Sequence, residues 1–183
     1  MRTEIRQLHN KLKTTTIYVT HDQIEAMTMA DQIVVMRAGK IEQMGTPDQV
    51  YDTPASKYVA DFIGSAAINF IEGTVVAGSG VPAVDVPGGR VMLAPNTAVQ
   101  PGQRVILGLR PTDVTVQPDG PIRGKTLLLE RMGHDAQLCA QYGDRQFLAI
   151  VDKAQRFDTG ADVAFGIAPE KVHVFDATTE KRL

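Results

Sequence analysis

The part of the chain after residue 68 consists of short apolar or alternating runs that are separated by Gly, Pro, Asp and Asn. Such runs predict β-strands, and many short strands at this spacing are typical of a small barrel or sandwich. Gly88-Gly89 and Gly143-Asp144 are expected to form hairpin turns between strands. The expected strands cover residues 70–76, 81–86, 90–93, 104–110, 114–117, 122–131, 136–142, 145–151, 162–167 and 172–176.

The earlier residues follow a different pattern, in which helices and strands alternate. Apolar residues recur at helical spacing between Ile5 and Leu12 and predict a first helix. Residues 14–20 are rich in β-branched side chains, which predicts a strand. A second strand, residues 32–37, is expected to turn back and pair with residues 40–44.

Three further helix starts are indicated by local signals. Asp22 followed by Glu25 has the spacing of a capping box. Residues 46–47 and residues 53–54 are both Thr-Pro, so each pair is expected to place threonine at the N-cap and proline at the first helical position.

Gly64 ends the last expected helix, and the small residues after it are typical of a domain boundary. We therefore expect two domains, an α/β part over residues 1–64 and an all-β part over residues 65–183. The β-rich part carries more apolar alternation than a barrel of this size can bury. This pattern predicts that it pairs with a second chain.

The composition argues against several classes of function. The net charge of −2 gives no broad attraction to phosphate backbones, and aromatic residues do not alternate with basic ones, so no nucleic-acid partner is expected. No apolar run approaches the roughly 20 residues that span a bilayer. Cys139 is expected to be a packed thiol. His9, His134 and His173 lack the spacing of metal ligands, so no metal site is predicted.

His21 is the candidate catalytic residue. It follows the expected strand over residues 14–20 and precedes a helix start. In an open α/β sheet, this edge is where ligands bind. An imidazole there could hold a terminal phosphate and orient the attacking water. Taken alone, a histidine after a strand is more often a structural or surface residue.

The wider sequence around His21 resembles a known family. Residues 18–31, YVTHDQIEAMTMAD, resemble the switch-histidine region of ABC-transporter ATPases, and most closely the carbohydrate-importer branch typified by the maltose-importer ATPase subunit. The resemblance continues through residues 33–41 (IVVMRAGKI), 45–47 (GTP), 62–65 (FIGS), 108–111 (GLRP) and 166–175 (GIAPEKVHVF).

The resemblance implies a fold and a function. It implies an α/β remnant of an ABC nucleotide-binding domain, followed by an all-β OB-like barrel called a TOBE domain. In the intact protein, His21 would be the switch histidine at the γ-phosphate of ATP, with Mg²⁺ as the second cofactor. The protein would be the ATPase subunit of an importer for a sugar or a related small solute. It would work with transmembrane subunits, pair through its β domain, and lie in the cytoplasm against the inner face of the membrane.

The chain departs from this family in the residues that hold the nucleotide. It contains no phosphate loop of the form G-x-x-x-x-G-K-[ST], no Leu-Ser-Gly-Gly-Gln signature and no strand that ends in the Asp-Glu pair. Residues 120–126, GPIRGKT, have only three residues between the glycines and are expected to form a plain turn. No cofactor-binding residue is therefore predicted here, and the chain alone is expected to be inactive.

Two alternatives remain for the chain by itself. It could be a non-catalytic regulatory or dimerisation module, or a β-barrel that binds a small anion. Arg110, between Gly108-Leu109 and Pro111, also has two interpretations. Its side chain could be buried against turn carbonyls, which we favour, or it could line a regulatory contact.

Overall fold

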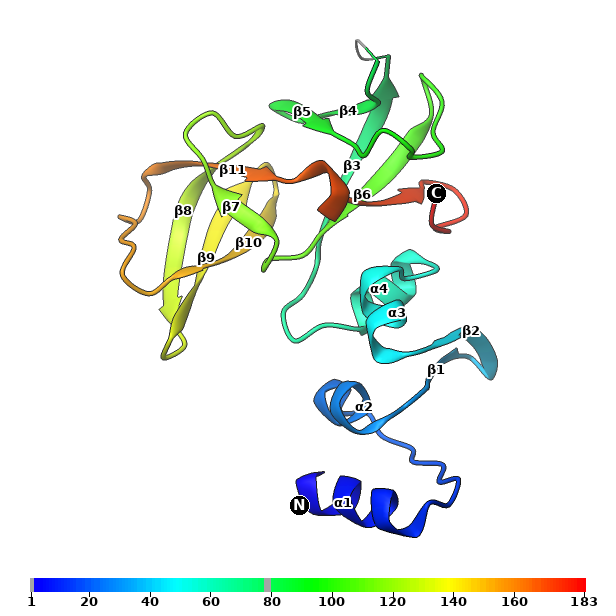
Figure 1. The fold of residues 1–183 in the computed structure, drawn as a ribbon. Coiled ribbons are helices and arrows are strands. Elements are labelled where there is room, and N and C mark those ends of the chain that lie inside the picture. The colour runs from blue at the N-terminus through cyan, green and yellow to red at the C-terminus, as the bar shows by residue number, and fades with distance from the viewer. Residues whose placement is uncertain (1, 78–79) are drawn as a thin grey trace. The chain divides into compact units, whose positions relative to one another are not determined.

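The computed structural model describes residues 2–77 and 80–183 (Figure 1). The chain divides between Ser65 and Ala66 into two compact units. The first unit contains α1 (Arg2–Leu12), α2 (Gln23–Met29), β1 (Ile33–Arg37), β2 (Lys40–Gly45), α3 (Pro47–Asp52) and α4 (Lys57–Phe62). The predicted first helix and the predicted hairpin over residues 32–44 are confirmed.

The first unit has a small core of its own. Buried side chains from β1, α3, α4 and the C-cap of α4 meet there: Ile33, Val35, Val50, Val59 and Ile63. Alternation along β1 explains the pattern, because Ile33 and Val35 face inward while Val34 between them is exposed. The opposite face of the β1–β2 hairpin is therefore apolar and open to solvent.

The strand predicted over residues 14–20 does not form. This segment has no strand or helix assignment, and Ile17 and Val19 are 89% and 91% exposed. A strand requires a neighbour that accepts and donates its backbone hydrogen bonds. Within the described residues, no strand pairs with this segment, so β-propensity alone does not produce one.

One of the two Thr-Pro helix starts is also wrong. Thr46 caps α3 as predicted, and it exchanges hydrogen bonds with Gln49 in a full capping box. Thr53 instead ends α3, since its N–H donates to the carbonyl of Gln49. The next helix starts at Ser56, whose hydroxyl accepts from the N–H of Val59. The stacked rings of Tyr58 and Phe62 on α4 are 5.9 Å apart between centroids.

The second unit is built from two antiparallel sheets of five strands each. Their orders are β10-β9-β8-β11-β7 and β12-β6-β3-β4-β5. The strands are β3 (Asn69–Val76), β4 (Ala83–Val86), β5 (Gly89–Met92), β6 (Arg104–Leu109), β7 (Val114–Val116), β8 (Ile122–Arg131), β9 (Asp135–Tyr142), β10 (Arg145–Asp152), β11 (Asp162–Ile167) and β12 (His173–Asp176). The predicted all-β barrel-like unit is thus confirmed.

The two sheets enclose one core and nearly close on each other. Strand β5 contacts β8, and β10 contacts β7. Gly89 makes the contact between β5 and β8 possible, because a Cβ there would collide with the backbone carbonyl of Pro121. Gly89 also pairs with Val86, so the β4–β5 turn is Pro87-Gly88 and not Gly88-Gly89 as expected. The Gly143-Asp144 turn forms as predicted, between Tyr142 and Arg145.

Candidate functional site

The turn at His21 is held from both sides by short polar contacts. Asp22 caps α2, because its Oδ1 accepts hydrogen bonds from the N–H groups of Ile24 at 2.8 Å and Glu25 at 3.2 Å. The N–H of Asp22 donates to Thr20 Oγ1 at 2.9 Å. His21 lies between these two anchors, and its side chain is exposed. The backbone of the turn is therefore fixed while the imidazole faces solvent.

Glu25 has a different role from the one its spacing suggested. A capping box would bring its carboxylate back to the N–H of Asp22. The carboxylate instead accepts hydrogen bonds from the hydroxyls of Thr20, at 2.6 Å, and Tyr18, at 3.1 Å. The hydrogen bond to Glu25, together with its negative charge, raises the pKa of Tyr18. The sequence pattern missed this contact because Thr20, not Glu25, satisfies the Asp22 N–H.

Both ends of α2 are tied to other parts of the first unit. The guanidinium of Arg6 on α1 donates to the carbonyl of Met29 and to Asp31 Oδ1, at 2.5 and 2.7 Å. At the other end, Gln23 Oε1 accepts from the N–H of Gly64 at 2.9 Å. The helix that follows His21 is thereby joined to α1 and to the end of the unit.

Residues 120–126, whose sequence is similar to that of a phosphate loop, do not form one. Gly124, Lys125 and Thr126 lie in strand β8, between its neighbours β9 and β11. Lys125 makes an ion pair with Asp162 at 3.0 Å on the surface. A phosphate loop needs a glycine-rich turn that leads into a helix, and a strand presents no such cluster of N–H groups.

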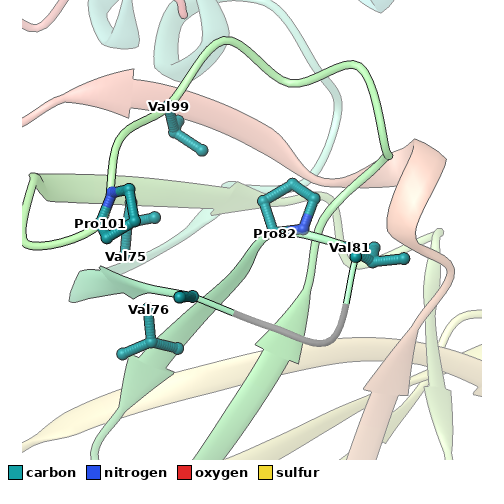
Figure 2. A pocket seen from close by; sticks show the side chains of 8 residues that line it. Val75, Val76, Val81, Pro82, Val99 and Pro101 are labelled. Carbon is teal, nitrogen blue, oxygen red and sulfur yellow. The ribbon is translucent and has the colours of Figure 1, made fainter.

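The second unit has a hollow beside the end of β3. Figure 2 shows the valine and proline side chains around it. It is lined by Val75, Val76, Ala77, Gly80, Val81, Pro82, Val99 and Pro101. None of these described lining residues carries a charge, so the hollow offers no cation for a small oxyanion.

Two residues near the end of β6 and the start of β12 are buried ionisable groups. Arg110 is buried, in line with the structural role we favoured. His173 is also buried, and burial together with the charges of Arg110, Arg182 and Lys171 lowers its pKa to about 3. The neutral ring accepts a hydrogen bond at Nδ1 from Arg182 at 3.0 Å. Within the described residues, no group of three metal-ligating side chains occurs.

Comparison with known proteins shows what the chain is similar to. Residues 107–175 match the TOBE domain. The whole chain aligns with an uncharacterized ABC transporter ATP-binding protein, y4oS of Sinorhizobium fredii, at 41% identity over 49% of that protein. It also aligns in full with the oligosaccharides import ATP-binding protein MsmX of Bacillus subtilis, at 38% identity over 53% of that protein. The chain corresponds to the C-terminal part of ABC importer ATP-binding subunits.

Another relative of this chain is named for a different solute. The sn-glycerol-3-phosphate import ATP-binding protein UgpC of Ruegeria pomeroyi is 38% identical, over the whole chain and 51% of that protein. The chain spans about half the length of the curated relatives it matches.

Among solved structures, the cytoplasmic molybdate-binding protein ModG is similar at 17% identity and a TM-score of 0.47. The similarity covers 58% of this chain and 94% of the ModG chain. A likeness this distant supports no functional inference. In the part of the chain that the structure describes, none of the helices combines the length and the apolar character needed to cross a bilayer.

Proposed function

We propose that this chain works within the ATP-hydrolysing subunit of an ABC importer for a sugar or a related small solute. In this role, residues 1–64 are the last part of the nucleotide-binding domain and residues 65–183 are the regulatory β domain. The observation that carries the proposal is that the alignment with importer ATP-binding proteins extends over the whole chain, the His21 turn included.

His21 acts in this proposal as the switch histidine. Its turn is anchored by Thr20 and Asp22, so the imidazole is presented at a fixed place on the backbone. A neutral or protonated imidazole can donate to a γ-phosphate oxygen and orient the attacking water. ATP and Mg²⁺ are held by residues outside this chain, because the phosphate loop and the signature sequence are absent from its 183 residues.

The partners follow from the same proposal. Two ATP-binding subunits close around ATP and act on transmembrane subunits, which places the protein in the cytoplasm against the inner face of the membrane. The β domain pairs with that of the second subunit. The exposed apolar side chains of the first unit, such as Ile17, Val19 and Ile41, support an association with further protein in the intact subunit.

The chain alone is proposed to be catalytically inactive. Backbone N–H groups and a lysine of the phosphate loop normally supply most phosphate contacts, so ATP affinity should be very weak without them. Phosphate release by the purified chain, with ATP and Mg²⁺, should equal the background. Turnover that persists through purification and disappears in His21→Ala would overturn this.

A further inference from the structure

A closed set of hydrogen bonds surrounds the backbone of His21. The hydroxyl of Thr20 donates to Glu25 Oε2 at 2.6 Å and accepts from the N–H of Asp22 at 2.9 Å. The N–H of Glu25 donates back to Asp22 Oδ1 at 3.2 Å. We call Thr20, Asp22 and Glu25, with these three hydrogen bonds, the turn relay. It joins the residues on both sides of His21 to one carboxylate on α2.

The carboxylate of Glu25 decides which way the Thr20 hydroxyl points. An ionised carboxylate can only accept hydrogen bonds, so the hydroxyl must direct its proton toward Glu25 and keep a lone pair for the N–H of Asp22. The distance of 2.6 Å is typical of a charge-assisted O–H···O⁻ hydrogen bond, which is about twice as strong as a neutral one. Thr20 and Glu25 are also only partly exposed, which limits competition from water.

The Thr20 hydroxyl in turn fixes the backbone of His21. A threonine hydroxyl that accepts from the N–H two residues later closes a small turn. His21 is the middle residue of this turn, so its backbone dihedral angles are set by the hydrogen bond across it. The direction in which the Cβ leaves the backbone is set with them. The exposed imidazole is therefore aimed by its two neighbours.

We propose that Glu25 is a positioning residue for His21 and that it acts through the hydroxyl of Thr20. The inference rests on the proposed function, in which the imidazole of His21 donates to the γ-phosphate of ATP. Correct orientation of a reacting group supplies a large part of catalysis, and a misplacement of about 1 Å can lower a rate about 100-fold. Neither Glu25 nor Thr20 needs to touch the nucleotide in this role.

A simpler role for Glu25 is to stabilise α2. An acidic residue in the first turn interacts favourably with the N-terminal end of a helix. That role depends on the charge of Glu25 alone and does not require the hydroxyl of Thr20, which precedes the helix. Thr20→Val removes the hydroxyl, nearly keeps the shape of the side chain and leaves Glu25 in place. This substitution therefore distinguishes the turn relay from a helix effect.

The first arm of the test measures the mobility of the His21 N–H in the full chain by ¹⁵N relaxation. Its order parameter should be about 0.85 in the wild type and fall below about 0.6 in Thr20→Val and in Glu25→Ala. Thr20→Ser retains the hydroxyl and should keep the wild-type value. Thr28→Val is the matched control, because the Thr28 hydroxyl on α2 donates only to the carbonyl of Ile24. Circular dichroism checks that each variant folds.

The second arm measures ATP hydrolysis by a chimera that joins the N-terminal half of MsmX to this chain. Thr20→Val and Glu25→Ala should each lower kcat at least about tenfold, while KM for ATP changes less than about twofold, because His21 acts in the transition state. The double variant should lie within about threefold of the weaker single variant, since both break one relay. Thr20→Ser should recover most of kcat, and Thr28→Val should match the parent chimera.

The outcomes separate the turn relay from the proposed function. A chimera that stays fully active with His21→Ala would overturn the role of His21 and this inference together. A chimera that needs His21 but tolerates Thr20→Val would overturn the inference alone, and a loss confined to Glu25→Ala would assign Glu25 to α2. If the chimera is inactive, the order parameters decide, since values unchanged in both variants would show that the relay does not hold His21.

Discussion

The side chain of Asn69 and the backbone of Leu148 exchange two hydrogen bonds, and in doing so they join the two sheets of the β unit. Asn69 Nδ2 donates to the Leu148 carbonyl at 2.8 Å, and the Leu148 N–H donates to Asn69 Oδ1 at 2.7 Å. Nδ2 also donates to the carbonyl of Leu109 at 3.1 Å. One buried amide therefore satisfies backbone groups of β6 and β10 together.

Asn69→Ala should destabilise the β unit by about 1–3 kcal/mol, because it leaves the Leu148 N–H and two carbonyls without their partner. Urea unfolding monitored by circular dichroism measures the change. Asn96→Ala removes an exposed asparagine from a loop and is the control, with an expected change near zero. Equal changes in the free energy of unfolding for the two substitutions would show that the hydrogen bonds of Asn69 between the sheets do not stabilise the β unit.

The stability of the β unit should fall as the pH is lowered below the ordinary pKa of histidine. Burial holds the pKa of His173 at about 3, so the folded state keeps the ring neutral while the unfolded chain takes up a proton near pH 6.5. The unfolded state thus binds more protons between these values, and stability should decrease by up to about 1.4 kcal/mol per pH unit as pH falls through this window.

The contribution of His173 can be isolated by substitution. His173→Gln should flatten the pH dependence of the unfolding free energy between pH 6.5 and 4. Asn96→Ala replaces an exposed loop residue that does not titrate and should leave that dependence unchanged. A wild-type slope that survives His173→Gln would assign the pH dependence to other groups.

The carboxylate of Glu25 should be what raises the pKa of Tyr18. Glu25→Gln removes the negative charge that disfavours the phenolate, so the Tyr18 pKa should fall toward its ordinary value. NMR titration of the Tyr18 ring measures this. Glu42→Gln is the control, and Tyr142, whose pKa burial raises to about 12, provides an internal reference that neither variant should move.

Gly124 should tolerate no side chain, because a Cβ there would lie 2.5 Å from the carbonyl oxygen of Gln141. Gly124→Ala must push β8 away from β9 and should cost about 1–3 kcal/mol in thermal unfolding. Gly143→Asn is the comparison, since Gly143 has a φ of 59° and nothing within 4 Å, and asparagine adopts that conformation readily. Comparable melting temperatures for both variants would contradict the close approach.

His21 should be required for turnover once the missing nucleotide-holding residues are supplied. A chimera that joins the N-terminal half of MsmX to this chain should hydrolyse ATP, and His21→Ala should reduce kcat by at least about 100-fold. His134→Ala in the same chimera should be neutral. Full activity of the His21→Ala chimera, with ATP bound normally, would remove His21 from the mechanism.

Local signals in the sequence predicted elements whose partners lie nearby in the chain. Turn residues and the alternation of apolar side chains were enough to predict the hairpin of β1 and β2, the Thr46 cap and the β-rich second unit. The strand over residues 14–20 failed because its partner is not among the described residues. The helix start predicted at Thr53 was wrong because Thr53 is the C-cap of α3, where its N–H donates to the carbonyl of Gln49.

At the candidate site, the sequence predicted that His21 precedes a helix start, but it did not predict all of the hydrogen bonds that fix the turn around it. Asp22 was expected as a cap and is one. The contact between Thr20 and Glu25 was not predicted. The N–H of Asp22 could donate to the Glu25 carboxylate or to Thr20 Oγ1, and sequence spacing does not show which of the two accepts. The burial of His173 likewise depends on strands that are distant in sequence, β6 and β12.

A β-bulge in β8, where it pairs with β9, limits how this protein can change over evolutionary time. Leu127 is the extra residue of this bulge, because Thr126 and Leu128 on either side of it pair with the consecutive residues Ala140 and Cys139. Substitutions at Leu127 should be accepted freely, and its deletion would remove the bulge without moving any other side chain of β8 to the opposite face. A one-residue deletion elsewhere in β8 would shift the register and reverse the side-chain faces, so related chains should differ in length at this point of the strand and rarely at others.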